Sequence, residues 1–200
     1  RAVGVWGPRW FDGKRGTVWR LYKGTPPEHL FEFLRRRDCS YLNLGARAAH
    51  ALALEATRLG MEVAIDAIVA QGESCDEDDR RACHDVFGAR VVEHYSSKEM
   101  GQGAHQCEHG RLHLNEENIL VEILGPDGQP CELGVPGRVV VTPLFATAQP
   151  LIRYAQGDIA TLGHPCACGR SGRSIDKIVG RVAAIFRHPD GRATFRSMPT

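Results

Sequence analysis

The chain has 200 residues, of which 42% are hydrophobic and 24% charged, a composition typical of one large or two small soluble domains. Its 25 basic and 24 acidic residues leave a formal net charge of +1, which argues against nucleic acid or an acidic membrane surface as a partner. No apolar run approaches the ~20 residues that span a bilayer, and the first residues lack the apolar core of a signal peptide, so we expect a cytoplasmic protein.

The chain begins with signals for both strands and a helix. Aromatic and β-branched runs at Ala2–Trp6 and Thr17–Tyr22 indicate strands or an irregular sheet edge. Thr25 precedes Glu28 by three residues, which is the spacing of a capping box and predicts the start of a helix. Phe31 lies on the apolar face expected for that helix.

Strands and helices then alternate up to about residue 104. The predicted elements are a strand and turn at Tyr41–Gly45, a helix at Ala46–Arg58 that ends at Gly60, a strand at Val63–Ala70, a helix that Ser74 and Glu77 cap and Gly88 ends, and a strand at Val91–Tyr95. This alternation favours right-handed crossovers and a parallel sheet. We therefore expect an α/β subdomain over residues 1–104.

The pattern changes in the second half of the chain. The β-branched runs Ile119–Leu124, Arg138–Thr142 and Leu151–Tyr154 are separated by turn residues, with no helical period between them. They predict a small antiparallel, barrel-like β subdomain over residues 105–180, so the expected fold class is α/β with a parallel part followed by an antiparallel part. A hairpin around Pro189–Gly191 is expected near the end of the chain.

The most informative stretch follows the predicted strand at Val91–Tyr95, where the apolar run breaks into a polar turn that carries Lys98 and Glu99. Open α/β sheets bind ligands at the carboxyl ends of their strands, so we expect Glu99 at a ligand-binding edge. A plain connecting turn is the alternative. Downstream, Asp158 follows Gly157 and is either a second site residue or an ordinary turn residue.

Two separated motifs place these residues in a family context. The residues from Tyr95 to Glu99 resemble the Y-G-x-T-E motif of adenylate-forming enzymes, and those from Leu151 to Asp158 resemble their Y-x-T-G-D motif. Between and after them stand Glu108–His113, Cys166–Arg170 and Gly180–Arg181. With this combination, the chain is similar to the phenylacetate-CoA ligase branch of the superfamily from about Phe31 to Arg181.

The resemblance implies that a carboxylic acid attacks the α-phosphate of ATP to give an acyl-adenylate and pyrophosphate, after which a thiol, commonly that of coenzyme A, forms a thioester. It also implies a magnesium ion on the phosphates, with Glu99 as the associated carboxylate. The ribose hydroxyls would bind Asp158 and Arg181, and the adenine would lie against Tyr95 and Gly72. The expected partners are a small-molecule carboxylic acid and a nucleotide, with homodimer formation left open.

The chain also departs from the family pattern. Lys98 stands where relatives have a threonine; it can neutralise phosphate as a point charge but cannot reproduce the close hydrogen bond of a hydroxyl. Ala183 stands where relatives place Asp or Lys, at the hinge that would open residues 181–200, the start of a C-terminal domain. Neither a phosphate loop nor an adenylation lysine domain is found, so we expect an internal portion of a longer enzyme, inactive alone. The alternative is a non-catalytic, zinc-stapled nucleotide-binding or interaction module.

Three cysteines and one histidine are spaced along the sequence in a way that is typical of metal ligands. Seven cysteines without a secretory signal argue against a disulfide framework. Cys107 and His113 form a Cys-x5-His pair, and Cys166 and Cys168 form a Cys-x-Cys pair, in separate turn-rich segments. Such a closed set would hold a structural zinc ion that joins two loops, and the family branch often carries the same residues. Reduced surface thiols are the alternative, and the competing ligands are His105, His109 and His164.

Overall fold

The structure of the chain is a computed structural model that describes residues 2–6, 16–22, 24–37, 39–182, 185–187 and 193–195. Its helices are α1 (Pro27–Arg37), α2 (Ala46–Leu59) and α3 (Glu77–Phe87). Its strands are β1 (Ala2–Trp6), β2 (Gly16–Trp19), β3 (Tyr41–Leu44), β4 (Ala67–Gln71), β5 (Arg90–Ser97), β6 (Gly101–Gln106), β7 (Leu112–Leu114), β8 (Ile119–Leu124), β9 (Gly137–Pro143), β10 (Tyr154–Leu162), β11 (Ser174–Arg181), β12 (Ile185–Arg187) and β13 (Ala193–Phe195).

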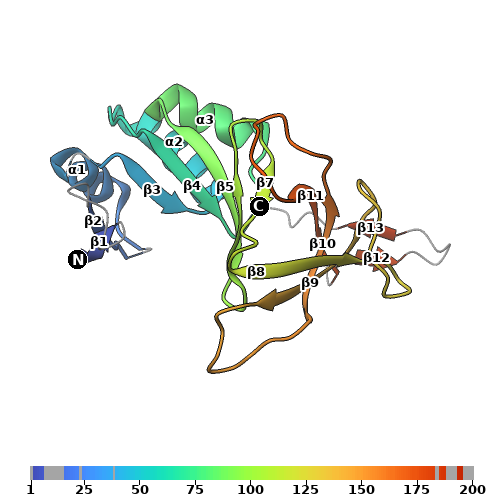
Figure 1. Cartoon of the computed structure of the whole chain (residues 1–200). Coiled ribbons are helices and arrows are strands. Elements are labelled where there is room, and N and C mark those ends of the chain that lie inside the picture. Colours follow the sequence, from blue (N-terminus) through green and yellow to red (C-terminus); the bar gives the residue numbers. More distant parts are fainter. Residues whose placement is uncertain are drawn as a thin grey trace.

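Nine strands form one mixed sheet in the order β3-β4-β5-β6-β7-β11-β10-β9-β8 (Figure 1). The strands β3, β4 and β5 are parallel, and every later neighbour in the sheet is antiparallel. The expected α/β class, with a parallel part followed by an antiparallel part, is confirmed. Because β3 and β8 stand at the two ends of an open order, the barrel-like closure is not confirmed.

The helices pack at the parallel end of this sheet, and the two later helices end at glycines as the sequence predicts. Gly60 and Gly88 both adopt the left-handed conformation, with φ of 63° and 67°, and their backbone N–H groups bond to the last turns of α2 and α3. The expected cap of α3 at Ser74 is wrong. Asp76 caps the helix instead, in a reciprocal capping box with Asp79, because it immediately precedes the first helical residue.

The strand limits differ from the expectations where polar or small residues continue a strand. The strand β4 begins at Ala67, four residues after the predicted start, and β5 continues through both serines to Ser97. The strand β10 occupies Tyr154–Leu162 rather than Leu151–Tyr154. Its small and polar side chains hide its strand character in the sequence, and the hydrogen bonds to β9 and β11 on either side decide its conformation.

Two hydrophobic clusters hold the structure together. The first lies among the helices and parallel strands and includes Phe31 and Ile68, both fully buried. The second fills the antiparallel part and includes Val121, Val139 and Ile175, also fully buried. The proposed subdomain limits, 1–104 and 105–180, stay a prediction, since the sheet itself runs through both clusters without a break.

The two ends of the chain form small separate sheets. The aromatic runs predicted strands or an irregular sheet edge, and the structure has two strands there, β1 and β2, which pair with each other. The strand β12 pairs with β13 in antiparallel orientation. Ala183 and the expected turn at Pro189–Gly191 lie outside the described residues. Within the described part of the chain, no helix combines the length and apolar character needed to cross a membrane.

Candidate functional site

The strand β5 brings Tyr95 to the centre of the candidate site. Its side chain is 8% exposed, and its hydroxyl donates a 2.7 Å hydrogen bond to Oδ2 of Asp158, a residue 63 positions further along the chain. Burial raises the pKa of the Tyr95 hydroxyl, and the bond to the neighbouring carboxylate raises it further. The hydroxyl therefore remains a proton donor at neutral pH, and it fixes one oxygen of Asp158.

The other oxygen of Asp158 is held by Arg181. These residues are direct cross-strand partners on β10 and β11, and the Arg181 Nε atom lies 3.0 Å from Oδ1 of the carboxylate. The guanidinium also donates from Nη2 to the backbone carbonyl of Gln156, at 2.9 Å. Tyr95, Asp158 and Arg181, which we call the Asp158 triad, thus form a connected group at the point where β5 and the β10–β11 hairpin face each other.

The turn after β5 adds charged side chains at the rim of this group. Lys98 and Glu99 lie in the turn between β5 and β6, and both are exposed. Backbone N–H donation and the Ser97 hydroxyl lower the pKa of the Glu99 carboxyl, and the positive charges of Arg181 and Lys98 lower it further. The Glu99 carboxylate is thus ionised at neutral pH, and it is close enough to the Asp158 triad to interact electrostatically with the Arg181 guanidinium.

Gly72 lies on the neighbouring strand end. It follows β4, which is the parallel neighbour of β5, and it has a φ of 82° that favours glycine. A Cβ atom placed on it would meet no atom within 4 Å, so the loop is open at this point. The structure therefore brings together Tyr95, Asp158, Arg181 and the Glu99 turn, with Gly72 at the same carboxyl edge of the sheet.

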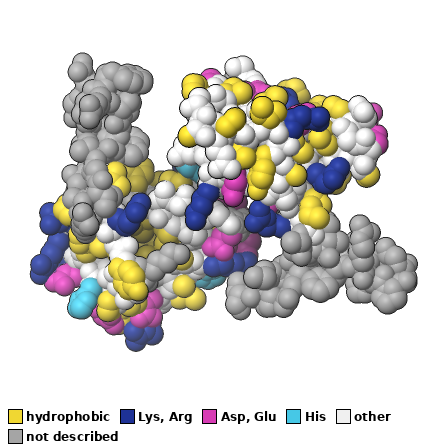
Figure 2. Space-filling view, turned by 90° about the horizontal axis from the view of Figure 1, so that it is seen from below, with side chains coloured by type: hydrophobic (Ala, Val, Ile, Leu, Met, Phe, Trp, Pro, Cys, Tyr) yellow, Lys and Arg dark blue, Asp and Glu magenta, His cyan; other side chains and the backbone are white. Residues whose placement is uncertain are grey.

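The surface view shows charged side chains where two parts of the molecule meet (Figure 2). Seen from below, hydrophobic side chains are spread over the lobe at the upper right, and acidic and basic side chains gather where this lobe meets the rest of the molecule (Figure 2). A carboxylate held by two side chains, a guanidinium and a second, exposed and ionised carboxylate are together suited to bind hydroxyl groups and a metal-associated anion.

Two polar residues near the site were missed by the sequence analysis. Gln156 is 5% exposed, and its side-chain oxygen is buried with no hydrogen-bond partner among the described residues. Glu93 lies on β5 two residues before Tyr95 and accepts a hydrogen bond from the loop after β4. The two-residue period of a strand places Glu93 on the same face as Tyr95, and this signal could have identified it.

A second group of side chains forms a candidate metal centre. The ligand atoms of Cys107, His113, Cys166 and Cys168 all lie within 4.8 Å of one another, and among the described residues the three competing histidines are not part of the group. The Cys107 and Cys166 sulfurs are 3.7 Å apart, and the Cys168 sulfur is 3.3 Å from Nε2 of His113. Tetrahedral zinc with Zn–S and Zn–N bonds of about 2.3 and 2.1 Å would separate two sulfurs by about 3.8 Å and a sulfur from a nitrogen by about 3.6 Å, so these residues fit the ion.

The surroundings favour the metal-binding forms of His113 and Cys107. Burial lowers the pKa of the His113 imidazole, and the Arg170 charge lowers it further, so the ring is neutral at pH 7. Burial would raise the pKa of the Cys107 thiol, but backbone N–H groups at His109 and Arg111 and the neighbouring thiols outweigh it and lower that pKa. A neutral imidazole and an accessible thiolate are the forms that bind zinc.

The fold is shared with solved acyl-CoA ligases. An open conformation of 2-hydroxyisobutyryl-CoA ligase in complex with 2-HIB-AMP and CoA superimposes with a TM-score of 0.74 at 20% identity, over 88% of this chain and 43% of that chain. The anthranilate CoA ligase AuaEII in complex with anthranoyl-AMP gives a TM-score of 0.61 at 14% identity, over 84% of this chain and 34% of that chain. These likenesses establish the fold.

The sequence resemblance is likewise confirmed. The chain is 32% identical over 143 residues to phenylacetate-coenzyme A ligase of Thermus thermophilus, a match that covers 67% of this chain and 32% of that enzyme. No family model matches the chain. The chain thus resembles part of an adenylate-forming acyl-CoA ligase, and it spans about a third of the length of the curated relative that it matches.

Proposed function

We propose that this chain is part of an ATP-dependent enzyme that activates a carboxylic acid as an acyl-adenylate and then forms a thioester with coenzyme A, in the manner of phenylacetate-CoA ligase. The observation that carries the proposal is the Asp158 triad, which joins the two family motifs in space through a hydrogen bond of 2.7 Å and extends to Arg181 through an ion pair of 3.0 Å. Agreement between motif order, fold and this contact supports a nucleotide site better than any of them alone.

The residues divide the work of nucleotide binding. Asp158 would accept hydrogen bonds from the ribose hydroxyls through its remaining lone pairs, because Tyr95 and Arg181 already fix the orientation of its carboxylate. Gly72 would let the backbone approach the adenine ring without a side chain between them. Tyr95 would form the wall on the other side of the base.

The proposed reaction consists of two displacements, the first of pyrophosphate and the second of AMP, and it requires the negative charge of the phosphates to be neutralised. The substrate carboxylate attacks the α-phosphorus, a P–O bond forms, and the bond to pyrophosphate breaks; the thiolate of coenzyme A then attacks the acyl carbon and AMP leaves. A magnesium ion held by Glu99 would neutralise charge on the phosphates. Lys98, which is exposed beside Glu99, would supply a second positive charge in place of the family hydroxyl.

The candidate metal centre would be structural. With three thiolates and one imidazole the coordination sphere of zinc is closed, so no position remains for a substrate. The ion would connect two segments of the chain. Cys107 and His113 lie in the β6–β7 turn and on β7, and Cys166 and Cys168 lie in the β10–β11 connection.

The rival function is a non-catalytic, zinc-stapled nucleotide-binding or interaction module, for which Lys98 in the place of a threonine is the specific argument. Calorimetry of the full chain with AMP and ATP tests the nucleotide site that both functions share. Pyrophosphate release by the full-length protein that contains this chain, measured with a panel of aryl and aliphatic acids, then separates the two functions. Release with any acid supports the ligase; nucleotide binding without release from any acid supports the module.

A further inference from the structure

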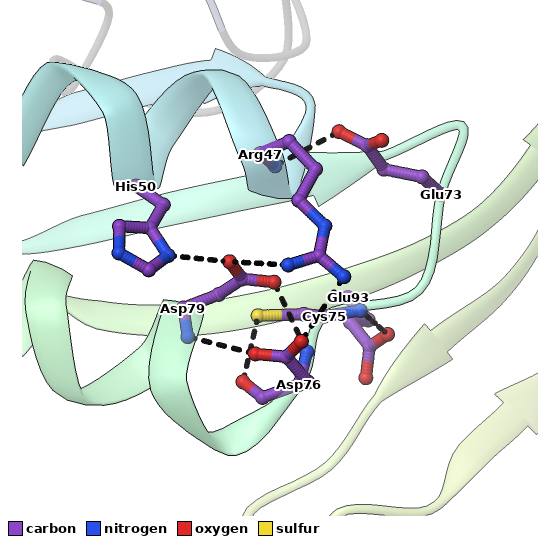
Figure 3. Close-up of polar contacts among 7 residues, drawn as sticks. All are labelled: Arg47, His50, Glu73, Cys75, Asp76, Asp79 and Glu93. Carbon is purple, nitrogen blue, oxygen red and sulfur yellow. Dashed lines mark hydrogen bonds and ion pairs between the residues drawn. The ribbon is translucent and has the colours of Figure 1, made fainter. Parts of the chain in front are cut away.

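The loop between β4 and α3, residues 72–76, is fixed by side chains from several elements (Figure 3). Glu73 reaches back to α2, where its Oε1 atom accepts the backbone N–H of Arg47 at 2.9 Å. That N–H belongs to the first turn of the helix and has no partner within the helix. The beginning of the loop is therefore tied to α2.

The end of the loop is fixed by a buried carboxylate. Asp79, which is fully buried, accepts the backbone N–H of Asp76 at 3.2 Å and lies 2.8 Å from Nδ1 of His50. Arg47 pairs with both acids, at 3.1 Å to Asp76 and 3.4 Å to Asp79. Figure 3 shows these side chains converging on Asp79 from α2 and from the loop.

The middle of the loop is held by Glu93. Its Oε1 atom accepts the backbone N–H of Cys75 at 2.9 Å. Its Oε2 atom is held by Arg80 of α3 at 2.6 Å and by the Gln106 amide of β6 at 3.1 Å. The carboxylate, with a side chain 19% exposed, thus connects the loop, α3, β5 and β6.

The position of Glu93 relates these contacts to the nucleotide site. It stands two residues before Tyr95 on the same strand, and the loop that it holds carries Gly72. If Tyr95 and Gly72 form the two walls of an adenine site, Glu93 is the side chain that bonds the loop to the strand of the opposite wall. The distance between the walls then depends on this carboxylate.

We propose that Glu93 is a positioning residue that sets the width of a slot for the purine base between loop 72–76 and Tyr95. The proposal rests on the proposed function, because it assigns the base of the nucleotide to this place. Glu93 would act through the Cys75 N–H, while the ribose would be held separately by Asp158 and Arg181.

The substitution Glu93→Gln tests this, because the amide keeps the shape but turns one acceptor into a donor that faces Arg80 and Gln106. Calorimetry and competition on the full chain would compare AMP with ribose 5-phosphate, which lacks the base. We expect the affinity for AMP to fall about tenfold, the effect of one hydrogen bond to a charged group, and that for ribose 5-phosphate to change less than about twofold.

The matched control is Glu116→Gln. Glu116 also bridges two segments, since it holds the backbone N–H and the Nε atom of Arg173 at 3.0 and 2.8 Å, but it has no contact with the loop. Glu116→Gln should leave the ratio of the AMP and ribose 5-phosphate affinities unchanged.

If Glu93→Gln does not fold, Gln106→Ala provides a second test. This substitution removes one donor from the Glu93 carboxylate and should lower the affinity for AMP alone by about threefold.

The outcomes separate the two proposals. Equal losses for AMP and ribose 5-phosphate, or unchanged AMP affinity in the folded Glu93→Gln and Gln106→Ala variants, would overturn the role of Glu93 while leaving the nucleotide site intact. Binding of ribose 5-phosphate as tight as that of AMP by the unsubstituted chain would overturn the base slot. Binding of neither ligand by the unsubstituted chain would overturn the proposed function and the inference together.

Discussion

At the scale of single residues, the Asp158 triad is a small network in which each member fixes another. Tyr95→Phe removes the hydroxyl donor from a buried carboxylate and, among the residues that the structure describes, leaves Arg181 as its side-chain partner. Hydrogen bonds to charged groups contribute about 1.5–3 kcal/mol, so we expect the free energy of unfolding to fall by about that amount in urea titrations. Nucleotide affinity should fall too, because Asp158 would lose its fixed orientation.

Tyr22→Phe serves as the control, since the Tyr22 side chain is 83% exposed. It should change the free energy of unfolding by less than about 0.5 kcal/mol. Equal effects of the two substitutions would show that the Tyr95 hydroxyl contributes nothing specific to the structure.

His94 gives a pH-dependent prediction at the same scale. Burial lowers the pKa of its imidazole below the ordinary value of 6.5, and the facing ring of His105, 4.3 Å away between centroids, lowers it further. Below pH 6.5 the unfolded chain therefore binds a proton that the folded chain does not, and stability falls as the pH falls. Thermal unfolding between about pH 8 and 5.5 should show this loss, and His94→Gln should reduce the slope. An unchanged slope in the variant would contradict it.

At the scale of elements, the β10–β11 hairpin joins both sites. Its strands carry Asp158 and Arg181 at one end, and its connection carries Cys166 and Cys168 at the other. Removal of a zinc ion would free the connection, and because structural zinc is worth about 10 kcal/mol or more, thermal stability should fall markedly. Cys168→Ser should lower zinc content and melting temperature together, as measured by elemental analysis and calorimetry.

Cys39→Ser is the control for the metal centre. Cys39 lies in the first hydrophobic cluster, away from the four ligand side chains, so zinc content should stay near that of the unsubstituted chain. Zinc content far below one equivalent in the unsubstituted chain, purified without chelator, would contradict the metal centre.

The elements also show what a sequence can and cannot predict here. The sequence correctly predicted that α2 and α3 end at Gly60 and Gly88. A helix commonly ends at a residue in the left-handed conformation, and glycine adopts that conformation most easily. The cap of α3 was misplaced because Ser74 and Asp76 both suit that role, and only the contact with Asp79 decides between them. The strand β10 was shifted because its neighbours in the sheet, not its own side chains, determine its limits.

The candidate sites divide in the same way. Side chains in motifs could be named from the sequence, including the four candidate metal ligands that the structure brings within 4.8 Å. The bond from Tyr95 to Asp158 could not be predicted, because it joins two residues on different strands that are 63 positions apart in sequence. The role of Glu93 depends on contacts from three other elements and could not be predicted from local pattern either.

At the scale of the whole molecule, one continuous sheet carries both hydrophobic clusters, so we expect the two clusters to unfold together. Ile68 on β4 and Ile175 on β11 are both fully buried, one in each cluster. We expect Ile68→Ala and Ile175→Ala each to lower the free energy of unfolding by about 2–5 kcal/mol. In calorimetry each should shift a single common transition, whereas separate transitions would indicate two independently folding units.

The candidate metal ligands in the β10–β11 connection also bear on how homologous sequences can vary. Connections between antiparallel strands usually tolerate insertions and deletions, because they lie at the surface and hold little of the core. If the four side chains bind one metal ion, Cys166 and Cys168 must stay within reach of Cys107 and His113 while β11 pairs with β7 at Ser174 and His113. Among homologues that keep the four ligands, this connection should therefore be nearly constant in length, and length variation should appear only where the ligands have been lost.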